Sequence, residues 1–219
     1  MPSTLVLVPT DLERRVLAPL LASGLGDGDR LELCGFGPVA AAARTAALVA
    51  ARAPDRVLLV GIAGRFDARL SIGAAYRFDG VASHGIGAGS GDAFVPAATL
   101  GWLQWAGDPA PTDAAIGDVI NLSRSRSASA SSGGLLLTAC AASATGGDVA
   151  SRRKLFPAAT AEDMEGFGVA LACRLHGVPL GIVRGISNDA GDRDHGRWQM
   201  RAALDAAAAL ALRILEEPS

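Results

Sequence analysis

The feature that most constrains the fold is a continuously apolar run, Val57-Leu58-Leu59-Val60, which leads directly into Gly61-Ile62-Ala63-Gly64. A strand whose side chains are apolar in both directions must be buried on both faces, and sheets of that kind are mainly parallel and covered by helices on each side. Five further runs are typical of strands in the same sheet: 3–8, 31–34, 75–83, 134–138 and 180–186.

Segments with helical spacing follow most of these runs: 11–22, 39–53, 148–156, 165–176 and 200–216. In the first segment, Leu12, Val16, Leu20 and Leu21 recur on one helix face and are expected to be buried. Strands that alternate with helices indicate an α/β fold. We therefore expect a three-layer α/β/α arrangement around a central, largely parallel mixed β-sheet, with ligands at the carboxyl ends of the strands.

The chain has 219 residues and a formal net charge of -2. This length suits a single domain over residues 1–219, with a variable loop region at about 85–132 that ends in the low-complexity stretch 123–132. A near-neutral charge carries no signature of nucleic-acid or membrane binding, and neither partner is expected. Without a targeting segment or an apolar run of about 18 residues, the expected localisation is cytoplasmic.

The three cysteines, Cys34, Cys140 and Cys173, are odd in number and far apart in the sequence. That usage is typical of reduced thiols that serve in packing.

Two acids lie near expected strand ends. Glu165 begins a helix, where the helix dipole favours a carboxylate. It is either a first-turn acid only, or a carboxylate that accepts hydrogen bonds from a sugar diol, with Met164 beneath the ribose. Glu13 lies one turn into the first helix, and it is either a solvated acid or a general base that activates water.

Small and amide residues follow two of the apolar runs. Gly61 and Gly64 flank an expected tight turn, which reflects either backbone geometry alone or close approach of the main chain to a ligand. Asn188 follows the run at 180–186, and an Asn-Asp pair there is typical of a turn or of a helix N-cap. The acidic cluster beyond it, Asp189, Asp192, Asp194 and His195, lacks EF-hand spacing, so no metal is expected there. No organic cofactor is expected either.

Two motifs, Met164-Glu165-Gly166 and Arg184-Gly185-Ile186-Ser187-Asn188, resemble those of the nucleoside phosphorylase/nucleosidase superfamily. The resemblance extends over most of the chain in order, and it includes Glu13 and the segments 35–39, 54–64 and 161–177. Asn188 through Asp194, followed by Trp198, is similar to the signature of the futalosine hydrolase branch, which neighbours the methylthioadenosine/S-adenosylhomocysteine nucleosidases.

The resemblance implies a role for each matching residue. Met164 and Glu165 hold the ribose, and Glu13 activates water. The residue after the Ile-Ser pair faces the purine near N7 and C6. An Asp there suits a 6-amino group, whereas the amide of Asn188 can donate to a 6-oxo group, which implies hypoxanthine as the leaving base. The implied site comprises catalytic Glu13 and Asn188 and substrate-binding Gly61, Ile62, Ala63, Gly64, Thr138, Ala142, Ser143, Asp163, Met164, Glu165 and Ser187.

The implied reaction is hydrolysis of the N-glycosidic bond of a 6-oxopurine nucleoside by a homodimer. The implied substrate is futalosine, which carries a 5′-linked carboxyphenyl ketone, and its products are hypoxanthine and dehypoxanthine futalosine, on a route to menaquinone. Two alternatives stay open: a purine nucleoside phosphorylase, in which Arg14, Arg44 or Arg65 holds phosphate, and a nucleoside-binding protein without turnover.

One segment departs from the superfamily pattern. The base-binding loop at 138–145 contains only small residues. Trp102 or Trp105 is therefore a candidate to complete the pocket wall.

Overall fold

The computed structural model describes residues 3–107, 115–122 and 131–217. Its strands are β1 (Thr4–Val8), β2 (Arg30–Leu33), β3 (Arg56–Arg65), β4 (Ala75–His84), β5 (Gly87–Ala88), β6 (Val95–Pro96), β7 (Val119–Asn121), β8 (Ser132–Ala139), β9 (Ala159–Asp163) and β10 (Leu180–Asp189). Its α-helices are α1 (Asp11–Leu21), α2 (Pro38–Arg52), α3 (Gly146–Leu155), α4 (Gly166–Leu175) and α5 (Met200–Glu216). The five predicted helices are therefore confirmed within two residues at their ends.

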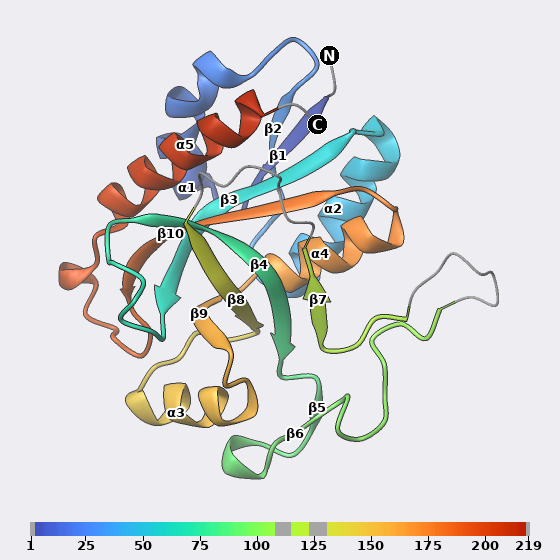
Figure 1. Ribbon diagram of the computed structural model, residues 1–219, viewed down its shortest axis with the longest axis vertical. Coiled ribbons are helices and arrows are strands. Elements are labelled where there is room, and N and C mark those ends of the chain that lie inside the picture. Colours follow the sequence, from blue (N-terminus) through green and yellow to red (C-terminus); the bar gives the residue numbers. More distant parts are fainter. Residues whose placement is uncertain (1–2, 108–114, 123–130, 218–219) are drawn as a thin grey trace.

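A central mixed sheet organises these elements, as predicted (Figure 1). Its strand order is β10-β4-β8-β9-β3-β1-β2, and β7 pairs with β4. β3 also pairs in parallel with β10. The strands β3, β10, β4, β8 and β9 therefore form a closed ring, while β1 and β2 extend the sheet beyond it.

Helices cover both sides of the part of the sheet formed by β1 and β3 (Figure 1). Leu5 and Leu7 of β1 share a buried apolar cluster with residues of α2 and α4. The alternate residues Val6 and Val8 belong to a second cluster with α1 and α5. The same alternation holds along β3, so the apolar run of that strand is buried on both faces because both faces are covered.

The sheet runs further than the apolar runs predict. Gly61 to Gly64 form no tight turn: they continue β3, which pairs with β10 as far as Arg65. This correction follows from ring closure, because Gly64 and Arg65 also pair with β9. A side chain at Gly64 would approach Ala190, since a Cβ there would lie 3.3 Å from its Cα.

Two strands of the central sheet, β7 and β9, were not predicted, and neither was the separate pair β5 and β6. β9 reads Ala-Thr-Ala-Glu-Asp and so resembles a polar loop in sequence, yet every one of its residues is buried. Its polar side chains find partners in neighbouring strands and loops, as described below. Only partners that are distant in the sequence make this strand possible.

In its described parts, the variable loop region contains the short strands β5, β6 and β7 and a 3₁₀ helix at Gly91–Ala93. Most of the low-complexity stretch, residues 123–130, lies outside the described residues. Cys34 and Cys173 are buried as predicted, but Cys140 is exposed. Within the described ranges, no helix has the length and apolarity to cross a membrane.

Candidate active site

A cavity of about 390 Å³ lies where β1, β3, β9 and β10 end and where the segment after β8 passes. All but two of the predicted site residues line it; the exceptions are Gly61 and Thr138. The cavity therefore lies at the carboxyl ends of these strands, where a ligand is expected from the sequence.

Glu13 is buried and lines the cavity, unlike a solvated helix acid. Thr10 caps α1, and its backbone N–H and hydroxyl donate to Oε2 of Glu13 at 3.2 and 2.6 Å. The backbone N–H of Ile62 donates to Oε1 at 3.1 Å. This capping box and the β3 contact hold the carboxylate in one orientation.

Arg184 of β10 is fully buried beside this carboxylate. Its guanidinium bonds to Asp163 through Nε and Nη2 at 3.1 and 2.6 Å, and Nη2 lies 3.3 Å from Oε2 of Glu165. Nη1 has no hydrogen-bond partner among the described residues. Burial lowers the pKa of Arg184, but the surrounding carboxylates outweigh this effect and hold the pKa above its usual value, so the group is a permanent cation.

Gly61 contributes space rather than a ligand contact. A Cβ at Gly61 would lie 2.2 Å from Nη1 of Arg184 and 2.7 Å from Oε1 of Glu13. Both polar atoms therefore occupy the volume that a side chain would fill, and they lie close to each other. A glycine is needed here because two catalytically suited groups approach the backbone.

Glu165 is the buried N-terminal capping residue of α4 and lines the cavity. The backbone N–H of Gly37, in the turn before α2, donates to its Oε1 at 3.1 Å. Burial raises the pKa of Glu165 to about 7, against the opposing effect of Arg184, and nearby Asp163 raises it further. The carboxyl group therefore titrates near neutral pH.

Asp163 and Thr138 form the support beneath this arrangement. The hydroxyl of Thr138 donates to Oδ1 of Asp163 at 2.6 Å and accepts from the backbone N–H of Phe167 at 2.8 Å. Oδ2 of Asp163 accepts from Arg184 and from the backbone N–H of Gly166. Although Asp163 borders the cavity, its oxygens are engaged by protein donors, so the pair orients Arg184 and the start of α4.

Asn188 lies at a bulge of β10, where Ile186 pairs with Ala63 and Asn188 pairs with Gly64, so that Ser187 is the additional residue. Bulges re-aim side chains beside active sites. The hydroxyl of Ser187 donates to Oδ1 of Asn188 at 2.7 Å, and Nδ2 of Asn188 donates to the carbonyl of Asp189 at 2.8 Å. An amide nitrogen carries two hydrogens, so the second remains for a ligand.

The loop after β8 is anchored by a buried ion pair. Glu162 accepts from the backbone N–H and the hydroxyl of Ser143 at 2.8 and 2.7 Å. Arg152 of α3 bonds to Glu162 and donates to the carbonyl of Ala141 at 2.7 Å. Ser143 therefore borders the cavity with its donors already used, and Ala142 lines the cavity beside it.

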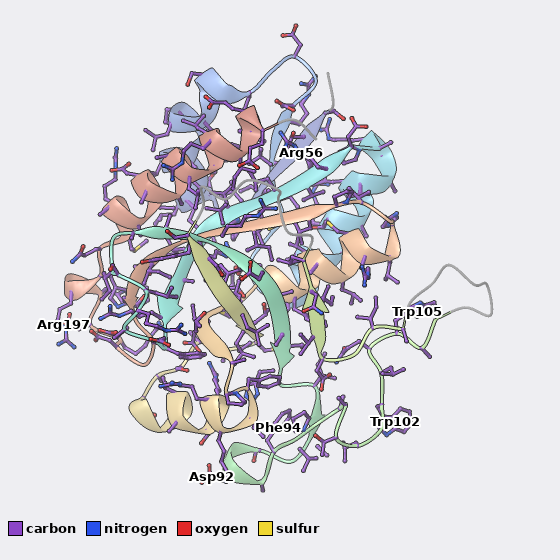
Figure 2. All side chains as sticks on the ribbon, viewed as in Figure 1. Arg56, Asp92, Phe94, Trp102, Trp105 and Arg197 are labelled. Atoms are coloured by element: carbon purple, nitrogen blue, oxygen red, sulfur yellow. The ribbon has the colours of Figure 1, made fainter. Side chains whose placement is uncertain are left out.

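The mouth of the cavity is apolar and aromatic. It includes Leu12, which is 58% exposed rather than buried as expected, and Phe36, which is 65% exposed. Trp198 and Met200 complete this part of the lining. The wall predicted from Trp102 or Trp105 is absent from this lining; Figure 2 shows both on the loop that lies beside β7, away from Arg197.

The acidic cluster after β10 engages arginines. Arg197 bonds to Asp192 at 2.8 Å and lies 3.4 Å from Asp194, and Arg65 bonds to Asp189 at 2.6 Å. Over the ranges described, no group of three or more His, Cys, Asp or Glu side chains is placed to hold a metal ion.

Sequence reasoning missed Arg184, Glu162 and Arg152. The sequence did indicate a paired Arg184, because it lies inside the apolar run 180–186 and a buried arginine needs a partner. Glu162 and Arg152 carried no such signal, since their pairing depends on how α3 folds back onto β9.

Comparisons with known proteins identify the family of this chain. The sequence model of the phosphorylase superfamily matches residues 30–217. The futalosine hydrolase of Streptomyces coelicolor is 36% identical over 188 residues, which are 83% of this chain and 76% of that protein. The futalosine hydrolase of Thermus thermophilus is 32% identical and the match covers 97% of this chain and 95% of that protein.

The fold also matches solved structures. The 5′-methylthioadenosine/S-adenosylhomocysteine nucleosidase from Neisseria meningitidis, in complex with methylthio-immucillin-A, superposes with a TM-score of 0.77 at 20% sequence identity, covering 99% of both chains. At this identity the likeness establishes a shared fold.

Proposed function

Since the chain belongs to the phosphorylase superfamily and, within it, to the futalosine hydrolase family, we propose that it hydrolyses the N-glycosidic bond of a 6-oxopurine nucleoside. Futalosine is the proposed substrate, and hypoxanthine and dehypoxanthine futalosine are the products. One observation carries the proposal: the buried Glu13 carboxylate lies beside Nη1 of Arg184, in the same cavity as Asn188 and Glu165.

The proposed mechanism begins with the ribose. Ionised Glu165 accepts hydrogen bonds from the sugar hydroxyls and fixes the ring. As the bond between C1′ and the purine nitrogen lengthens, positive charge develops on the ribose ring. The carboxylates of Glu13, Asp163 and Glu165, which surround Arg184, stabilise this charge electrostatically.

Water is the proposed nucleophile. A water molecule held by Nη1 of Arg184 and by Glu13 would satisfy a buried donor that has no partner in the described chain. Glu13 takes a proton from this water, and the water oxygen bonds to C1′. The electron pair of the broken bond goes to the purine, which takes up the proton that Glu13 releases through solvent and leaves as hypoxanthine.

Base selection is assigned to Asn188. Ser187 and Asp189 fix the amide so that one hydrogen on Nδ2 remains for the ligand. That donor suits the carbonyl oxygen or N7 of hypoxanthine. A 6-amino group would meet a donor instead of an acceptor, which a polar pocket rejects strongly.

The charges favour water over phosphate. The three arginines that could have served a phosphate do not line the cavity. Arg14 bonds to Asp11, Arg65 bonds to Asp189, and Arg44 lies 3.9 Å from Glu32. Near Glu13, a phosphate would face the carboxylates of Asp163 and Glu165, which already engage the buried cation Arg184.

The proposal also covers the whole molecule. We propose a single domain with three α/β/α layers, supported by the two apolar clusters on opposite faces of β1 and β3. We propose a homodimer as well. It is supported by large apolar side chains that are exposed in this chain: Phe36, Val39, Ile86, Leu100, Trp102, Leu103 and Val119.

A substrate panel tests the proposal. Base release is measured from futalosine, inosine and methylthioadenosine, each with and without phosphate. We expect release of hypoxanthine from futalosine at a rate that phosphate does not change, and little release of adenine. Release that requires phosphate would identify a phosphorylase, and tight binding without release would identify a nucleoside-binding protein.

A further inference from the structure

The segment between β10 and α5 forms one side of the cavity mouth through Arg193, His195 and Trp198. The guanidinium carbon of Arg193 lies 5.2 Å from the centre of the Trp198 ring. The His195 ring lies 4.4 Å from the same indole. The indole N–H donates to the carbonyl of Asp192 at 3.1 Å, which fixes the ring that supports the cation.

Arg193 differs from its neighbouring arginines because it has no carboxylate partner in the part of the chain that the structure describes. Asp192 and Asp194 flank it in sequence, yet both engage Arg197. Arg65, near the end of β10, is engaged by Asp189. Within the described residues Arg193 has only its contact with Trp198, although it lines the cavity and is exposed.

The cavity changes character from its interior to its mouth. Glu13, Glu165 and Asn188 are at most 8% exposed and supply polar atoms. At the mouth, Leu12 and Phe36 are mostly exposed, and Arg193 adds the positive charge. A nucleoside whose base and ribose occupy the buried end extends its 5′ substituent towards this apolar, cationic rim.

We propose that Arg193, supported by Trp198, binds the carboxylate of an aromatic 5′ substituent. The assignment rests on the proposed function and names the feature of the substrate that this site selects. An arginine held over an indole offers donors for a carboxylate in bidentate geometry, and the aromatic part of the substituent packs on the apolar rim.

The test compares one substrate in two charge states. Futalosine and its methyl ester differ only in the carboxylate, and both carry the same scissile bond. For the variant Arg193→Met, we expect the KM for futalosine to rise about 10- to 100-fold with kcat within about twofold, and the kinetics of the ester to stay unchanged. Arg193→Lys keeps the positive charge but loses the bidentate guanidinium. Its KM for futalosine should lie between those of the unmodified protein and of Arg193→Met.

Arg197→Met is the matched control, because Arg197 is a cation of the same segment but does not line the cavity. It should affect futalosine and its ester equally. Thermal melting of each variant confirms that the fold is retained.

Three results would overturn the assignment. The first is an equal loss on both substrates in Arg193→Met, and the second is no loss on futalosine. The third is a cleavage rate that depends on phosphate and whose phosphate dependence changes in Arg193→Met. That result would make Arg193 a phosphate ligand instead. If the unmodified protein cleaves neither substrate, the proposed function fails and this assignment fails with it; cleavage of both without charge dependence overturns only the role of Arg193.

Discussion

Asn188 has an amide nitrogen where an aspartate has a carboxylate oxygen. In the proposed function, this hydrogen-bond donor selects a 6-oxopurine over a 6-aminopurine. Asn188→Asp replaces the donor with a carboxylate that can accept from a 6-amino group. We expect kcat/KM for hypoxanthine release from futalosine to fall about 100-fold or more, and adenine release from methylthioadenosine to rise. Both are measured by chromatography of the released base.

Asn121→Asp is the control for this change, because Asn121 is exposed on β7 and does not line the cavity. It should leave both activities unchanged. If Asn188→Asp lost activity on both nucleosides equally, Asn188 would serve only to stabilise the bulge of β10.

The pKa of Glu165 predicts a pH dependence. Because burial raises this pKa to about 7, the ionised form that accepts from ribose hydroxyls is lost as the pH falls through 7. We expect log kcat/KM for futalosine to decline below about pH 7, and the residual activity of Glu165→Gln to lack that decline. A profile that is flat from pH 5 to 8 would contradict the assignment.

Stability should change in the opposite direction. The folded pKa of Glu165 lies above the unfolded value of 4.5, so protonation stabilises the fold fully below 4.5, and this contribution is lost as the pH rises through 7. We therefore expect the free energy of unfolding of Glu165→Gln, minus that of the unmodified chain, to increase as the pH rises from 4.5 to 7. Denaturant titrations at each pH measure this difference. An unchanged difference would mean that Glu165 is not buried as an acid.

Among the elements, the contact between α2 and α4 links packing to the site. A Cβ at Gly168 of α4 would lie 2.2 Å from the carbonyl oxygen of Pro38, the first residue of α2. The adjacent Gly37 donates to Glu165. Gly168→Ala should therefore lower the free energy of unfolding by about 1–3 kcal/mol and raise the KM for futalosine, as measured by urea titration and steady-state kinetics.

Gly146→Ala is the matched substitution. Gly146 begins α3, and a Cβ there would meet nothing within 4 Å. Its stability should stay within about 0.5 kcal/mol of the unmodified chain. Equal effects of the two substitutions would show that the contact between α2 and α4 is not tight.

The elements also show what local sequence can predict. β1, α1 and α5 follow from apolar periodicity, because each buries one face or both faces against the core. β9 could not be predicted in this way, since its Glu162 and Asp163 are buried only because Arg152 and Arg184 reach them from α3 and β10. The continuation of β3 through Gly61 and Gly64 likewise depends on its pairing with β10 and β9.

The same division applies to the site. Glu13, Glu165 and Asn188 were found because each occupies a motif near a strand end. Arg184 was visible in its motif but received no role, since its partners come from β9 and α4. Arg193 could not be distinguished from Arg197 by sequence, because only the folded segment shows which one engages the neighbouring acids.

At the scale of the whole molecule, the closed ring of strands joins the site residues that β3, β9 and β10 contribute. A residue of β3, β9 or β10 cannot move without disturbing its neighbours in the ring. A single domain of this kind should unfold in one step, so far-ultraviolet circular dichroism and tryptophan fluorescence should give coincident urea transitions. Two separated transitions would contradict the proposed single domain.

The proposed homodimer is tested by light scattering coupled to size-exclusion chromatography. The predicted mass is twice that of the 22.1 kDa chain. A monomer at catalytic concentrations that retained full activity would contradict the dimer and leave the exposed apolar side chains unexplained.

The most direct test of the central claim is the rate of hypoxanthine release from futalosine in phosphate-free buffer, for the unmodified protein and for Glu13→Gln. Asp11→Asn is the control, because Asp11 is a partly exposed acid in the first turn of the same helix and does not line the cavity. The account predicts turnover by the unmodified protein and by Asp11→Asn, and a loss of about 10²- to 10⁴-fold in Glu13→Gln with futalosine still bound. Equal rates for all three proteins, or no release without phosphate, would contradict it.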